Sequence, residues 1–227
     1  MLTLKLAGGV ILNLVIFGVL LFVPAGTIDW WRAWVLMGVV LIATTATMFG
    51  VLRHDEGLLD ERYRAPIQQG QPMTDRIIVL SLLAAFFGLM ILIPIDVFHL
   101  HLMRMPGPAV SWIGLALFIA GWTVIAIALG ENSFAAPVVR YQRERGQIVI
   151  EHGLYGIVRH PMYAGALLLM FGMPIWLGSY AAAIWALVPI AVMAMRAVLE
   201  ERFLRGALEG YDGYMHRTRY RLIPLVW

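Results

Sequence analysis

The sequence predicts an all-α fold, a polytopic membrane helix bundle of about six spans. Composition supports this prediction, because 61% of the 227 residues are hydrophobic and only 14% are charged, whereas soluble domains carry about 25% charged residues. Long runs without charge and an uneven distribution of arginine between the connecting loops point the same way. Together these features indicate a chain that crosses the membrane several times.

Four runs in the first part of the chain each supply the roughly 20 apolar residues that a spanning helix needs. They are Leu6–Ile28, Ala33–Leu52, Ile77–Ile95 and a stretch within Met105–Gly130. A fifth run, Pro161–Met195, is too long for one span, and Gly178 and Ser179 lie near its middle. We therefore expect a tight hairpin of two short helices there, which brings the number of spans to six.

The basic residues lie almost entirely on one side of this topology. Fifteen of the 17 Lys and Arg residues fall near the N-terminus and in segments 53–76, 131–160 and 196–227, and the other two are Arg32 and Arg104. The positive-inside rule then predicts that both termini and these three polar segments are cytoplasmic. A short chain without cysteine and with small outer loops suggests a bacterial inner membrane.

Several classes of function are disfavoured by what the chain lacks. Without cysteine it has no thiolate metal site and no cysteine nucleophile, and its histidines and carboxylates do not have the spacing of a zinc site, so we expect no metal. The basic residues are not interleaved with aromatic residues on a soluble face, so nucleic acid is not an expected partner. Neither a G-x-G-x-x-G nor a P-loop pattern occurs, which disfavours a standard soluble nucleotide-binding fold.

The segment GLYGIVRHPMYAG, residues 153–165, places polar residues directly before an apolar run. A residue before proline avoids the helical region and proline favours the first helical position, so His160 should cap a helix that begins at Pro161. Tyr163 then lies in the first turn, near unpaired backbone N–H groups and the positive end of the helix dipole, where an anionic ligand group would fit. The alternative is that Arg159 and His160 are only interfacial anchors.

Two adjacent glutamates follow the second helix of the hairpin. Arg196, Glu200, Glu201 and Arg205 have the spacing of ordinary i,i+4 surface pairs. Glu200 also has a second interpretation, because the returning helix lies beside the helix that begins at Pro161 and brings a carboxylate near His160. Further on, the segment from 211 to 221 contains three tyrosines and three arginines, which fits either an amphipathic tail on anionic lipid or a lid over a cytoplasmic pocket.

The order of these motifs resembles the isoprenylcysteine carboxyl methyltransferase family and the related phospholipid methyltransferases. R-H-P-x-Y-x-G at 159–165 is followed by the apolar hairpin, the E-E pair at 200–201, Y-x-x-Y at 211–214 and R-x-R-x-x-P at 219–224. Upstream of these motifs, segment 132–147 is similar to bacterial members of the family. The resemblance covers about 131–227 and departs at 153–155, where G-P-Y is commoner than G-L-Y. It suggests two parts: four N-terminal transmembrane helices with the cytoplasmic loop 53–76 in 1–130, and a methyltransferase-like region with the helical hairpin and cytoplasmic tail in 131–227.

The resemblance implies an integral membrane methyltransferase that uses S-adenosylmethionine, bound by the cytoplasmic C-terminal segment. Carried over to this sequence, the catalytic residues would be Arg159, Glu200 and Glu201, and the cofactor-binding residues Tyr155, Arg159, His160, Pro161, Tyr163, Glu200, Glu201 and Arg219. The acceptor would be lipidic or a small hydrophobic molecule with a carboxylate, amine or thiol. Two alternatives are an NADPH-dependent reductase of the sterol-reductase type, which shares a similar R-H-P-x-Y hairpin, and a non-catalytic membrane protein with the same fold.

Overall fold

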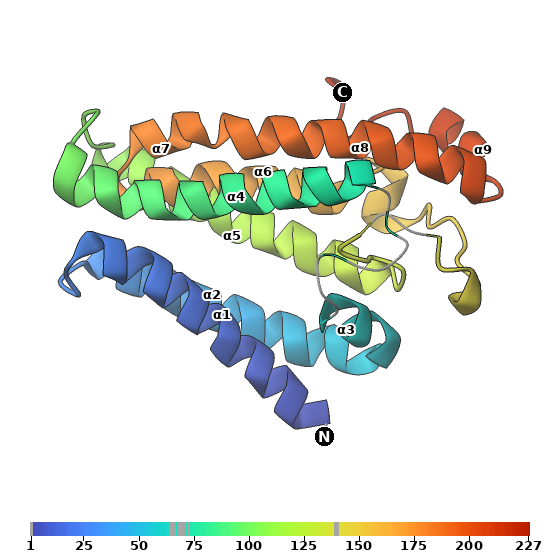
Figure 1. Cartoon of the computed structure of the whole chain (residues 1–227), viewed down its shortest axis with the longest axis horizontal. Coiled ribbons are helices and arrows are strands. Elements are labelled where there is room, and N and C mark those ends of the chain that lie inside the picture. The colour runs from blue at the N-terminus through green and yellow to red at the C-terminus, as the bar shows by residue number, and fades with distance from the viewer. Residues whose placement is uncertain (1, 64–66, 68–70, 72, 139–140) are drawn as a thin grey trace.

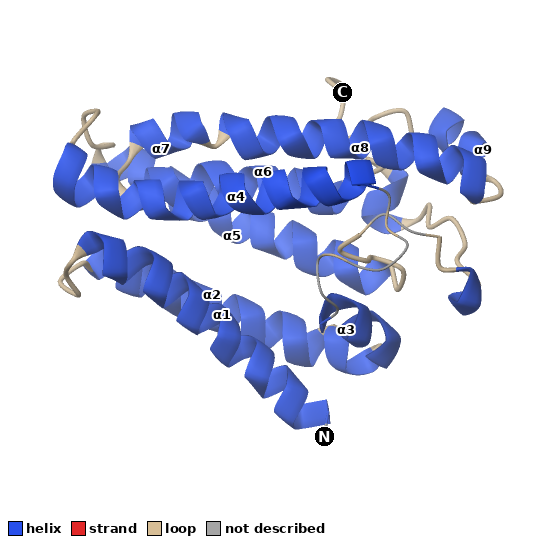
Figure 2. Cartoon of the chain, in the orientation of Figure 1, coloured by secondary structure: helices blue, strands red, loops and turns tan. Residues whose placement is uncertain are grey.

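The described part of the chain is helical in the computed structural model (Figures 1 and 2). The structure describes residues 2–63, 67, 71, 73–138 and 141–227. Two of the fifteen basic residues that we expect on the cytoplasmic side, Arg64 and Arg140, lie outside these ranges. The predicted all-α class is confirmed for the described residues, in which the strand-like pairing is the isolated bridge between Val158 and Tyr220.

Nine α-helices follow one another along the described residues. They are α1 (Leu2–Ala25), α2 (Trp31–Gly50), α3 (Glu56–Tyr63), α4 (Met73–Ile95), α5 (Pro108–Glu131), α6 (Pro161–Leu177), α7 (Tyr180–Trp185), α8 (Leu187–Ala207) and α9 (Tyr211–Arg217). A π-helical turn, Asp96–Leu100, extends α4, and short 3-10 turns cover Leu52–His54, Arg143–Arg145 and Gly153–Gly156.

The long helices make the chain a multi-pass membrane protein. Five helical segments are long and apolar enough to cross a bilayer: Leu2–Ala25, Trp31–His54, Met73–Leu100, Pro108–Glu131 and Tyr180–Ala207. The remaining predicted span, the first helix of the hairpin, corresponds to α6, which is apolar but has 17 residues. At 1.5 Å per residue α6 is about 26 Å long, slightly less than the hydrocarbon core.

The predicted break in the fifth apolar run is confirmed at Gly178 and Ser179. Gly178 has a φ of 108°, a conformation that residues with a Cβ rarely adopt, and its N–H donates to the carbonyl of Pro174 to end α6. Ser179 begins α7, because its Oγ accepts a hydrogen bond from the N–H of Ala182 at 2.9 Å. The same Oγ donates to Asp96 Oδ2 at 2.6 Å and so joins the hairpin turn to the end of α4.

Helices α5 and α6 pack with their backbones in contact along two pairs of glycines. A Cβ added to Gly121 would lie 2.5 Å from the carbonyl oxygen of Gly165, and one added to Gly172 would lie 2.5 Å from that of Gly114. These distances leave no room for any side chain at the four positions. Gly165, the last residue of the R-H-P-x-Y-x-G motif, therefore serves helix packing and fixes how α6 sits against α5.

The polar segments gather at one end of the bundle, as the even number of spans predicts. In Figure 1, α3, α9 and the first residues of α1 lie at one end, and the connections α1–α2, α4–α5 and α6–α7 lie at the other. Between the two ends the core is filled by buried apolar side chains such as Trp176, Phe118 and Leu36. The α5–α6 connection and the segment after α8 return to the polar end, which is where a site built from all three polar segments can form.

Candidate active site

A cavity of about 180 Å³ opens where α6 begins and α8 ends. Its walls come from all three predicted cytoplasmic segments: Arg62 from α3, residues 132, 134–138 and 147–150 from the α5–α6 connection, and Tyr211 and Tyr214 from α9. Side chains of α6 and α8 complete it. Segments that are far apart in the sequence therefore meet at a single polar site.

The turn before α6 is shaped by contacts with the carboxylate of Glu131. Gly153 has a φ of 58°, and a Cβ there would collide with the carboxylate of Glu131, which accepts a hydrogen bond from the N–H of Leu154 at 2.8 Å. This turn places Tyr155 on the cavity wall with 7% of its surface exposed. Burial raises the pKa of Tyr155 to about 12, so its hydroxyl remains protonated and is hydrogen-bonded to Asn132.

His160 and Pro161 begin α6 as the sequence predicts, but the N–H groups of Tyr163 and Ala164 in its first turn are not unpaired. His160 is non-helical, with φ −126° and ψ 64°, and Pro161 is the first helical residue. The N–H groups of Tyr163 and Ala164 both donate to the carbonyl of His160, at 3.0 and 3.1 Å. The chain closes its own first turn, so these two groups are not available to an anion.

Glu200 faces the cavity together with Tyr163. The Tyr163 hydroxyl donates to Glu200 Oε2 at 2.6 Å, so the two side chains from α6 and α8 form one polar pair on the wall. Among the described lining residues Glu200 is the one carboxylate, and it is accompanied by the guanidinium-bearing residues Arg62, Arg159 and Arg196. Glu200 therefore lies at the α6 corner beside Tyr163, whereas the carboxylate that contacts His160 is that of Glu201.

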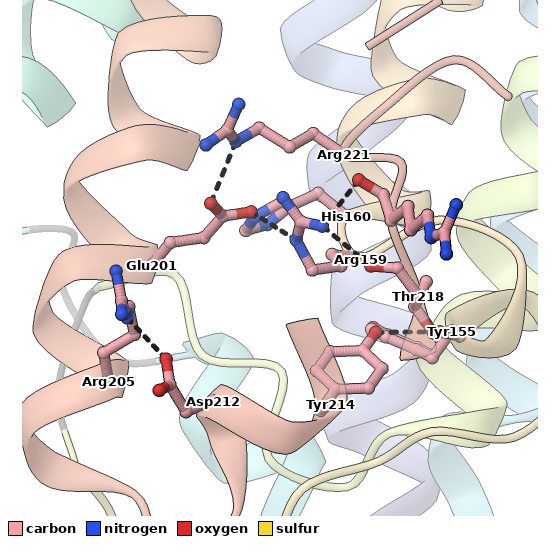
Figure 3. Close-up of polar contacts among 10 residues, drawn as sticks. Tyr155, Arg159, His160, Glu201, Arg205, Asp212, Tyr214, Thr218 and Arg221 are labelled. Carbon is pink, nitrogen blue, oxygen red and sulfur yellow. Dashed lines mark hydrogen bonds and ion pairs between the residues drawn. The ribbon is translucent and has the colours of Figure 1, made fainter. Parts of the chain in front are cut away.

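Glu201 points to a different place, behind the cavity wall, and binds three basic side chains (Figure 3). Its carboxylate accepts from Arg159 Nε at 2.7 Å and from Arg221 Nε at 2.9 Å, and it lies 3.2 Å from His160 Nε2. Glu201 is 2% exposed. The surface pair with Arg205 is wrong, because Arg205 instead binds Asp212 at 2.7 Å.

The segment after α9 is joined to the turn before α6. Arg159 Nη1 donates to the carbonyls of Thr218 and Arg219 at 2.7 and 2.8 Å, and its backbone N–H donates to the carbonyl of Tyr220. Figure 3 shows Tyr214 pointing at Tyr155, whose carbonyl accepts from the Tyr214 hydroxyl at 2.8 Å. The tail thus covers the corner, although the side chain of Arg219 is exposed and does not line the cavity.

The structure brings most of the predicted site residues together. Tyr155, Arg159, His160, Pro161, Tyr163 and Glu200 line one cavity, Glu201 lies directly behind it, and Arg219 contributes its carbonyl. The wall also contains polar residues that were not among the candidates, such as Arg62, Asn132 and Arg196. Asn132 begins the segment whose sequence similarity we noted, which was a usable signal, whereas no local pattern marks Arg62.

The fold and the site together define a class, an all-helical membrane protein with a polar cavity at one end of its bundle. Residues 109–209 match the family model of the phospholipid methyltransferases. The matched region makes up less than half of the chain and contains α6, α7, α8, nearly all of α5 and the glutamate pair.

Two further comparisons were made with known proteins. The chain matches the structure of the eukaryotic intramembrane Ras methyltransferase, isoprenylcysteine carboxyl methyltransferase, solved without a monobody. Sequence identity is 17% and the TM-score is 0.48, and the match covers 99% of this chain and 96% of the other. Among proteins with curated functions, none matches the sequence.

Proposed function

We propose that this protein is a methyltransferase that uses S-adenosylmethionine and methylates a lipidic or small hydrophobic acceptor at the cytoplasmic side of the membrane. The observation that carries the proposal is the cavity lined by Tyr163, Glu200 and the polar segments, in a chain whose residues 109–209 match the family model of the phospholipid methyltransferases. The family uses S-adenosylmethionine as its methyl donor.

The residues of the cavity fit the chemical groups of this donor. The sulfonium and the ammonium are positive, and Glu200 supplies the negative charge, oriented by the Tyr163 hydroxyl. The donor's carboxylate requires a cation, which Arg62 or Arg159 supplies. The adenine ring requires flat or apolar surfaces, and Tyr155 and the apolar side chains of 134–138 and 147–150 provide them.

Catalysis at such a site consists mainly of positioning. The donor supplies an electrophilic methyl carbon, which the acceptor atom gains while the sulfur keeps the bonding electron pair. The chain's task is to hold both molecules in line and to exclude water, so that charges interact strongly. Glu200 and Tyr163 would contact the donor directly, whereas Glu201 would act as a positioning residue, since its carboxylate is already occupied by three basic side chains. The cytoplasmic location and the division of the chain near residue 130 remain part of this proposal.

Binding calorimetry of the purified protein in lipid nanodiscs tests the proposal directly. We expect S-adenosylhomocysteine to bind and NADPH not to bind, and we expect Glu200→Gln to weaken S-adenosylhomocysteine binding about tenfold or more, which corresponds to about 1.4 kcal/mol. Glu209→Gln is the matched control, because Glu209 is exposed and outside the cavity. Binding of NADPH alone would replace the methyltransferase with the reductase alternative, and equal binding by both variants would place the site elsewhere.

A further inference from the structure

A second cavity of about 230 Å³ lies between the start of α4 and the second half of α8. Its apolar walls are Ile78, Leu199 and Phe203, and its polar wall is formed by Asp75, Arg196 and Glu200. Both helices belong to membrane-spanning segments, so lipid chains have access to this part of the molecule. The cavity is therefore suited to a hydrocarbon chain that carries a polar group at one end.

The two cavities share a wall, because Arg196 and Glu200 line both of them. On the side of the first cavity, Glu200 is held by Tyr163 at 2.6 Å. Among the described residues, these two side chains therefore separate a molecule in the second cavity from the first cavity. Methyl transfer requires them to move apart, because the acceptor atom must come within about 3–3.5 Å of the methyl carbon.

Arg196 has unused hydrogen-bonding capacity at this shared wall. The residue is 7% exposed, and its Nη2 donates to the carbonyl of Pro137 at 2.6 Å. Its Nε is buried and has no hydrogen-bond partner among the residues that the structure describes. Asp75 Oδ1 is 3.8 Å from this nitrogen, which is too far for a hydrogen bond. A buried guanidinium N–H without an acceptor is rare in proteins and marks a place where an acceptor is expected.

We infer that the cavity between α4 and α8 is the methyl-acceptor site, and that it takes a lipid with an apolar chain and an anionic oxygen, to which Arg196 Nε donates. The inference rests on the proposed function and names the acceptor class for that site. Arg196 is the cation that faces the cavity, and the apolar residues on its other walls fit the chain. An anionic oxygen releases no proton when it is methylated, so the site requires no general base.

A substitution of Asp75 should change the binding of anionic and cationic lipids in opposite directions. Its carboxylate lies on the same side of the cavity and faces the same guanidinium as the proposed acceptor, so it competes with an anionic ligand for Arg196. Asp75→Asn removes that negative charge and keeps a side-chain oxygen, which can still accept from Gln71. The variant should bind an anionic lipid several-fold more tightly, whereas damage to the fold would weaken binding. An amine-headed lipid should respond in the opposite direction.

The experiment uses a photoreactive palmitic acid with a diazirine in its chain and the full-length protein in phosphatidylcholine nanodiscs, with crosslinked peptides identified by mass spectrometry. We expect labels on peptides of α4 and α8, displaced by unlabelled palmitate more effectively than by hexadecylamine. Asp75→Asn should raise the labelling and Arg196→Gln should lower it, with Arg196→Lys intermediate because it keeps the charge. Stronger displacement by hexadecylamine, or weaker labelling of Asp75→Asn, would overturn the anionic assignment.

A neighbouring pair of residues supplies the spatial control. Ile78→Trp fills the cavity and should reduce labelling about tenfold, whereas Ile77→Trp adds the same ring at a position that is 57% exposed and does not line it. Equal labelling of the two variants would overturn the location. S-adenosylhomocysteine binding is measured on the same nanodiscs. If the protein binds S-adenosylhomocysteine but the lipid results fail, only the acceptor inference is refuted. If the unmodified protein does not bind S-adenosylhomocysteine, the proposed function is refuted instead.

Discussion

Glu200 and Glu201 are adjacent and chemically identical, yet the structure predicts opposite consequences when each is changed to glutamine. Glu201→Gln leaves the buried Arg159 and the partly buried Arg221 without their shared anion. Breaking a buried ion pair by removing one partner costs about 3–5 kcal/mol. Arg159 keeps its bonds to two tail carbonyls and the Arg221 side chain is 28% exposed, so we expect the lower end, about 3 kcal/mol of unfolding free energy.

Glu200→Gln should affect stability much less. Glu200 is half-buried and its recorded hydrogen bond is the one from the Tyr163 hydroxyl. Glutamine retains an oxygen that can accept this bond, so the loss is limited to the charge contribution, about 1 kcal/mol. Ligand binding should follow the reverse order, because Glu200 lines the cavity and Glu201 does not.

Unfolding in mixed micelles of a mild detergent and SDS, followed by tryptophan fluorescence, measures both losses. A double-mutant cycle with Arg221→Met adds a direct test, since removal of both partners should cost less than the sum of the single losses. Limited trypsin digestion should also release the tail beyond α9 faster in Glu201→Gln than in Glu200→Gln. If Glu201→Gln is no less stable than Glu200→Gln, or if the cycle is additive, the assignment of Glu201 as the residue that holds the tail is refuted.

Two further predictions concern the packing of the bundle. Gly121→Leu places a side chain where even a Cβ would lie 2.5 Å from the carbonyl of Gly165, so it should lower stability by about 3 kcal/mol or prevent folding. A thermal-shift assay would show this loss. The control is Gly38→Leu, which should leave the unfolding midpoint nearly unchanged because nothing lies within 4 Å of its Cβ position. Asp96→Ala removes the acceptor for Ser179 Oγ and for the N–H of Leu102, so it should lower stability by about 1–3 kcal/mol. S-adenosylhomocysteine binding should stay the same, because the proposed site is at the other end of the bundle. A large change in affinity would contradict the independence of the two ends.

The number and approximate place of the spans could be predicted because hydrocarbon imposes length and apolar composition on each one. The hairpin break was also predictable, since Gly178 and Ser179 interrupt a run too long for one helix. The glycine contacts between α5 and α6 left a signal that we did not use: Gly114 and Gly121 have the same seven-residue spacing as Gly165 and Gly172. Small residues at helical spacing are typical of close packing between membrane helices.

The polar contacts at the site were less predictable, because their partners are distant in the sequence. Local spacing favoured a pair between Glu201 and Arg205, four residues apart, but Glu201 binds Arg159 and Arg221 instead. On an exposed helix such a local pair is worth only about 0.3–0.5 kcal/mol, so burial against other segments easily outweighs it. For the same reason the sequence did not mark Arg62, whose place on the cavity depends on where α3 lies relative to α8.

The separate directions of the two glutamates follow from helix geometry. Adjacent residues on an α-helix point about 100° apart, so when the tail binds Glu201, it fixes the rotation of α8 and turns Glu200 toward Tyr163. The close contact of α6 with α5 at Gly165 holds Tyr163 in turn. Arg196 lies one turn before Glu200 on the same face of α8 and reaches both cavities. One rotation of one helix therefore orients the residue proposed to contact the donor and the residue proposed to contact the acceptor, and a substitution that loosens the tail should weaken binding of both ligands together.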